Sequence, residues 1–166
     1  MDLEGKSWLK AGLLGSGVDV AYSVLTSVLS IIPFLACISC LMLPLTCVLW
    51  VAIPIATGFM ASKWAKLKSG DTEAAVKEGA LAGLVLGLIS GSVNFVIQII
   101  FSIFNLTYAT SLTTLSDNSD YADLSFLPFS VGSTLVCGLF ALVIGIVFDM
   151  VFSLLGGIIY TATAKE

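Results

Sequence analysis

The sequence predicts an all-α, polytopic integral membrane protein in which four transmembrane helices form a compact bundle with small-residue packing faces. Its 166 residues are 58% hydrophobic and only 11% charged, whereas about a quarter of the residues in a soluble domain are charged. Four apolar segments reach the ~20 residues that a helix needs to cross a bilayer. We therefore expect a single membrane domain, 1–166, with helices at about 9–32, 35–60, 75–105 and 129–162.

The first apolar segment, 9–32, follows Lys6 and Lys10 and contains Asp19. Lysines before an apolar run resemble a secretory signal. This run, however, ends without a small-residue cleavage site and leads through Pro33 into a second apolar segment. We interpret it as a retained, signal-anchor-like helix, with a re-entrant or interfacial helix as the alternative.

The second segment, 35–60, contains the stretch CISC, in which Cys37 and Cys40 have the spacing of a thiol redox pair. Cys137 should enter the fourth helix from the same side, within reach of that pair. The arrangement resembles membrane oxidoreductases of the vitamin K epoxide reductase and disulfide-bond-forming classes. Cysteine as a small, buried apolar residue is the alternative. Because the thiols lie in the membrane and the chain has no histidine, we expect no metal site and no cofactor.

The third segment, 75–105, includes EGALAGLVLGLISG, with a glycine at every fourth position. Each glycine costs a soluble helix about 0.5 to 1 kcal/mol relative to alanine, but in a bilayer small residues let two helices approach closely. At 100° per residue these glycines share one face with Asn94 and Gln98. The fourth segment, 129–162, and the first carry comparable faces, so we expect all three to point inward. The predicted packing glycines are Gly79, Gly83, Gly87, Gly91, Gly138, Gly145 and Gly156.

Asp19 and Asp149 are not explained by packing, because a carboxylate deep in a bilayer costs at least ~2.5 to 3.5 kcal/mol. Both lie a similar distance from the inner ends of their helices, so they could face each other. One interpretation is a proton or cation site that relieves the repulsion between the two acids. Another is that each protonated aspartate hydrogen-bonds a neighbouring helix and stabilises the bundle. The candidate site comprises Asp19, Asp149, Asn94, Gln98, Ser16 and Ser153, the last four as neutral oxygen donors.

The seven lysines predict the orientation. If the N-terminus is cytoplasmic, all of them lie on the inner side, at the two termini and near the inner loop 61–74. The loop 106–128 has no lysine and three aspartates, so it belongs outside. We therefore expect a multi-pass protein of the cell membrane with both termini cytoplasmic. The absence of arginine and histidine argues strongly against a nucleic-acid partner.

The layout IIPFLACISC, then a lysine-bearing turn, then EGALAGLVLGLISG, resembles that of small uncharacterised prokaryotic membrane proteins. In that family a hairpin containing proline and cysteine precedes a Glu-Gly-Ala glycine-zipper helix. The resemblance covers about residues 10–100 and implies a four-helix membrane fold. It supplies no catalytic residue.

Three functions are consistent with these patterns. The first is a non-enzymatic membrane scaffold or accessory subunit, which contacts lipid and associates through its glycine faces with a second copy or a partner subunit. The second is a small ion- or proton-coupled transporter or channel that uses Asp19 and Asp149. The third is a thiol oxidoreductase that uses the CxxC pair. We expect a protein that is not an enzyme, because the sequence has no nucleotide motif and no catalytic triad.

Overall fold

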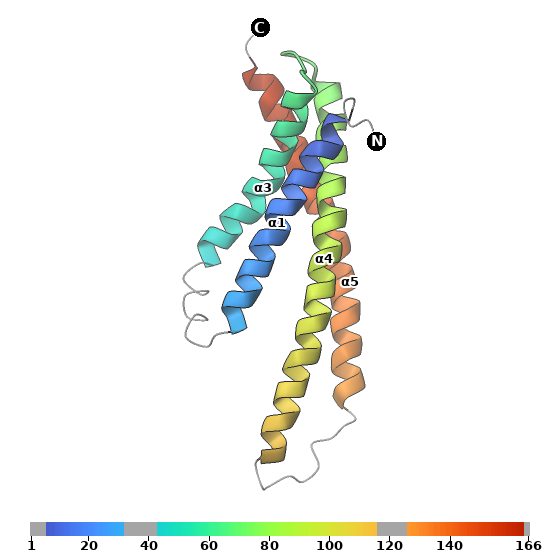
Figure 1. Ribbon diagram of the computed structural model, residues 1–166. Helices are drawn as coiled ribbons and strands as arrows, with labels where there is room; N and C mark the ends of the chain where they lie inside the picture. The colour runs from blue at the N-terminus through green and yellow to red at the C-terminus, as the bar shows by residue number, and fades with distance from the viewer. Residues whose placement is uncertain (1–5, 32–42, 116–125, 165–166) are drawn as a thin grey trace.

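The computed structural model describes residues 6–31, 43–115 and 126–164. These residues form four helices, α1 (Ser7–Ile31), α3 (Leu43–Trp64), α4 (Thr72–Leu115) and α5 (Phe126–Thr163), which pack together as shown in Figure 1. Each helix is long and apolar enough to cross a membrane, over Ser7–Val28, Pro44–Trp64, Thr72–Ile103 and Leu135–Thr163. The predicted fold class, an all-α membrane bundle, is confirmed.

The helix boundaries differ from the predicted ones. α4 continues to Leu115 rather than ending near 105, and α5 begins at Phe126, so much of the predicted outer loop 106–128 is helical. The reason is visible in the sequence, since 106–115 contains neither glycine nor proline to end a helix. The inner connection is also shorter than expected, spanning 65–71. The predicted start of the second helix at 35 lies outside the described residues.

α4 and α5 pack antiparallel along the predicted glycine face. A Cβ atom added to Gly79 would lie 2.8 Å from the Ser153 carbonyl oxygen, and one added to Gly87 would lie 2.8 Å from the Ile146 Cα. At Gly83 it would meet a backbone oxygen of α5 at 2.5 Å. Three successive turns of α4 therefore contact the α5 backbone directly, which only glycine permits.

α3 crosses α5 at a second glycine contact. A Cβ on Gly58 would overlap the backbone of Ser153, and a Cβ on Gly156 would overlap the carbonyl oxygen of Ile55. The residues buried beside this crossing are small, with Ala61 fully enclosed. Because lipid is as apolar as a side-chain core, close backbone packing replaces hydrophobic burial as the source of stability.

α1 lies between α3 and α4. The Ser7 hydroxyl donates a 2.6 Å hydrogen bond to Glu78 on α4, and the Tyr22 hydroxyl shares a 2.7 Å hydrogen bond with Thr46 on α3. Within the described ranges, no Cα atom of α1 lies within 8 Å of a Cα atom of α5. Figure 1 shows α1 and α3 lying together and diverging from α4 and α5 with distance from the termini.

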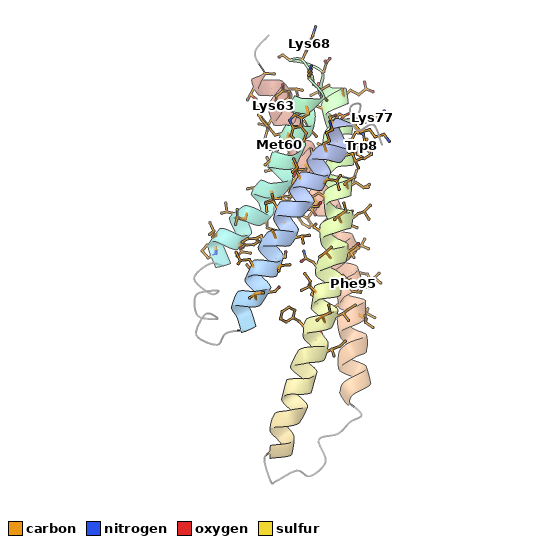
Figure 2. The ribbon with its side chains drawn as sticks, in the orientation of Figure 1. Trp8, Met60, Lys63, Lys68, Lys77 and Phe95 are labelled. Atoms are coloured by element: carbon orange, nitrogen blue, oxygen red, sulfur yellow. The ribbon has the colours of Figure 1, made fainter. Side chains whose placement is uncertain are left out.

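The described lysines gather at one end of the bundle. Lys63, Lys68 and Lys77 lie there with Trp8, and Phe95 lies much farther along α4 (Figure 2). The chain reverses direction at this end through 65–71, where Lys66 adopts a φ of 53° and the Leu67 amide donates to the Ser62 carbonyl at 3.3 Å. Both described chain ends and this turn therefore lie on the same side of the bundle (Figure 1).

Candidate functional site: a polar cavity between the helices

Asp19 and Asp149 line one cavity of about 250 Å³ between the helices, and this cavity is partly open. Asp19 comes from α1 and Asp149 from α5, two helices whose backbones are well separated within the described ranges. α4 contributes the polar side chains between them. The lining residues are Asp19, Trp50, Gly87, Ser90, Gly91, Asn94, Phe95, Gln98, Gly138, Ala141, Leu142, Gly145 and Asp149.

The helix pairings bring the two acids together. The register that sets Ser7 against Glu78 also sets Asp19 beside Ser90. The Ser90 hydroxyl also lies 2.8 Å from the carbonyl oxygen of Leu86 in its own helix. On the other wall, a Cβ on Gly87 would lie only 3.2 Å from Oδ2 of Asp149, so glycine at 87 makes room for that carboxylate. The two carboxyl groups interact electrostatically with each other.

The acids lie near the middle of the membrane-spanning segments. Asp19 is about 18 Å along α1 from Ser7, and Asp149 is about 21 Å along α5 from Thr163, at 1.5 Å per residue. The hydrocarbon core of a bilayer is about 30 Å thick. Both carboxyl groups are therefore placed where water is scarce, and charge there needs a compensating partner.

The cavity is bounded by close packing on the lysine side. There the backbones of α4 and α5 touch at Gly83, and Ala82 and Leu86 are buried. Along α4 the lining then extends about 16 Å in the other direction, from Gly87 to Gln98. The carboxyl groups thus lie at the tightly packed end of the cavity.

Two lining glycines keep the cavity volume free rather than joining helices. No described atom lies within 4 Å of the position that a Cβ of Gly145 would occupy. A Cβ of Gly91 would meet only Cγ of Leu142, at 3.6 Å, among the described atoms. The glycine faces therefore have two roles, because Gly79, Gly83 and Gly87 join α4 to α5 whereas Gly91 and Gly145 border the cavity.

The other predicted site residues lie elsewhere. Ser16 is buried one turn from Asp19, but its hydroxyl donates to the Leu13 carbonyl at 2.9 Å and does not line the cavity. Ser153 is fully buried in the packed layer between α3, α4 and α5. Asn94 and Gln98 do line the cavity. The structure therefore places four of the six predicted residues together.

The cysteines do not form a recognisable site in the described part of the chain. Cys137 on α5 and Cys47 on α3 are exposed free thiols. Cys37 and Cys40, the predicted redox pair, lie outside the described residues. Across residues 6–31, 43–115 and 126–164, no group of three or more histidine, cysteine or acidic side chains could hold a metal ion.

Two aromatic lining residues were not predicted. Phe95 follows the predicted polar face on α4, and its ring packs against Gly138, whose added Cβ would lie 2.9 Å from Cε2. Trp50 extends from α3, and its ring centroid lies 5.6 Å from that of Phe148. The sequence does hold a signal for Trp50. Tryptophan is enriched at the membrane interfaces, whereas this residue lies in the interior of a span.

Comparison with known protein families, with curated proteins and with solved structures finds no match to this chain. The site is therefore interpreted from its own geometry. The resemblance to small prokaryotic membrane proteins stays a prediction.

Proposed function

We propose that this chain is a small transport protein that binds a cation or protons at Asp19 and Asp149 and moves them across the membrane. The observation that supports this proposal is the shared cavity, which collects two carboxyl groups from two different helices in the middle of the span. Intramembrane acids that face a cavity commonly mark ion or proton pathways.

The chemistry follows from the electrostatics of the pair. Two nearby carboxylates repel each other, and the repulsion is strong where water does not screen it. A cation or a shared proton between them removes that repulsion. Asn94 and Gln98 supply neutral amide groups that can orient a bound species without adding charge.

The scaffold function predicted from the glycine faces ranks second on this geometry. Gly79, Gly83 and Gly87 are in contact with α5 of the same chain. A partner could use that face only by displacing α5. The exposed apolar side chains of α5, which include Phe140, Val143 and Val147, suit lipid contact.

The proposal includes an orientation. The lysine-bearing end is cytoplasmic under the positive-inside rule, so the cavity extends from the acids toward the outer side of the cell membrane. A cysteine introduced at Lys68, which is exposed in the turn, should react with a membrane-impermeant maleimide only after the cytoplasmic face is opened. Labelling of intact cells at this position would contradict the orientation.

Flux in proteoliposomes tests the proposed function. We expect cation-dependent or proton flux in the wild-type protein and its loss in Asp19→Asn and Asp149→Asn. The control is Glu73→Gln, which removes an exposed acid at the start of α4 and should leave flux unchanged. All variants should first be shown to keep wild-type helicity. Equal flux in both aspartate variants and the wild type would exclude these acids as the site.

A further inference from the structure

We infer that the species bound in the cavity is an organic cation, an ammonium group held by Asp19 and Asp149 and flanked by the aromatic rings of Trp50 and Phe95. This inference rests on the proposed function and names the substrate class of the same site. Three observations carry it: the cavity volume, its aromatic lining, and its two carboxyl groups with no basic residue among the lining residues.

The cavity is too large for a bare metal ion. Its volume of about 250 Å³ is many times the about 10 to 15 Å³ that a single water molecule requires. A hard cation such as Ca²⁺ binds tightly when six to eight oxygen atoms close around it at about 2.3 to 2.6 Å. The lining offers only two acids, from two different helices, and a few neutral polar groups among glycine and apolar side chains. A polyatomic cation fits this space better than a dehydrated metal ion.

The aromatic residues supply the type of surface that binds alkylammonium groups. Trp50 and Phe95 line the cavity that holds the acids, from α3 and α4 respectively. A cation within about 6 Å of an aromatic ring is attracted by the electron density of its face, most strongly for tryptophan and most when water is excluded. Phe95 lies against Gly138. Trp50 contacts Phe148 and is 53% exposed, so part of its ring surface is free to meet a bound cation.

The charge of the cavity selects for a cation. None of the lining residues is basic, and the labelled lysines lie at the far end of the bundle (Figure 2). Asn94 and Gln98 contribute dipoles but no charge. A monovalent organic cation could therefore interact with up to two carboxylates, and no basic side chain in the lining would compete for them.

Binding of tetraethylammonium to the purified protein, measured by isothermal titration calorimetry, tests the inference. This probe carries a fixed charge and no hydrogen-bond donor, so its binding depends on charge and aromatic contact. We expect Trp50→Leu to weaken binding about tenfold and Trp50→Phe, which keeps a ring, to weaken it less. Trp64→Leu is the matched control, because Trp64 ends α3 and lies outside the cavity lining, and should leave affinity unchanged. Asp149→Asn should weaken binding at least as much as Trp50→Leu.

The outcomes separate this inference from the proposed function. If tetraethylammonium does not bind while proton or sodium flux is present and depends on the aspartates, the organic-cation inference is overturned and the transport proposal stands. Equal affinity in Trp50→Leu and Trp64→Leu would also overturn it, because the aromatic contact would then be irrelevant. If no cation binds and no flux occurs, both proposals fail.

Discussion

Replacing Gly83 with alanine should destabilise the bundle, although alanine is the better helix former. By intrinsic preference alone, the change would stabilise α4 by about 0.5 to 1 kcal/mol. The added Cβ, however, would lie 2.5 Å from the Asp149 carbonyl oxygen and 2.7 Å from the Met150 Cα, both backbone atoms of α5. Relieving these contacts requires the two helices to move apart, and overpacking of this kind costs about 1 to 3 kcal/mol. We expect a net loss of up to about 2.5 kcal/mol.

The matched control is Gly17→Ala. Gly17 lies on the exposed face of α1, and a Cβ added there would have no described atom within 4 Å. Unfolding in mixed micelles of increasing denaturing-detergent fraction, followed by circular dichroism, gives the free energy of unfolding for each variant. Gly17→Ala should be neutral or slightly stabilising. If Gly83→Ala proves as stable as Gly17→Ala, the close α4–α5 contact does not exist as described.

Three further changes have defined outcomes. Ser153→Ala should keep or raise the free energy of unfolding, by up to about 1 kcal/mol, because the fully buried Ser153 hydroxyl has no hydrogen-bond partner among the described atoms; a clear loss in the same micelle titration would reveal a missing partner. Lys66→Gly should stabilise the turn after α3 by about 1 kcal/mol, since Lys66 adopts a positive φ; thermal unfolding in detergent measures this, and a lower melting temperature would count against it. Gly145→Leu should reduce flux in proteoliposomes without destabilising the fold, because its side chain would extend into the cavity; wild-type flux in a folded variant would show that the cavity is not the route.

Much of the helix arrangement could be predicted from residue spacing. The four-residue glycine repeat identified the face of α4 that contacts α5, because these glycines leave one side of that helix without side chains. The distance of each aspartate from its helix end placed the two acids at a similar depth. These predictions depend on the rise and rotation of an α-helix, which are fixed by backbone geometry.

The exact membership of the site could not be predicted, because a helical wheel gives an angle but not a separation between helices. Ser16 and Ser153 share the inward faces of Asp19 and Asp149, yet each lies about one turn nearer the lysine side, where the helices are tightly packed. The helices are close-packed at the level of the two serines, and the cavity begins at the level of the two aspartates. The divergence of α1 and α3 from α4 and α5 (Figure 1) depends on contacts among all four helices.

The length of α4 was underestimated for a different reason. The predicted helix ends where the apolar segment ends, near 105, and the residues that follow are rich in serine and threonine. Serine and threonine, however, are tolerated in helices, where their hydroxyls can bond a carbonyl one turn earlier. Without glycine or proline to stop it, α4 continues to Leu115.

Infrared absorption of the carboxyl groups in purified protein, recorded while protons, sodium and tetraethylammonium are varied separately, is the decisive test of a cation or proton site at Asp19 and Asp149. We expect the carboxyl bands to change on addition of the bound species. That change should be diminished in Asp19→Asn and in Asp149→Asn, absent when both are replaced, and retained in Glu73→Gln. Carboxyl bands that do not respond to any of the three would refute such a site and leave the two aspartates with a structural role.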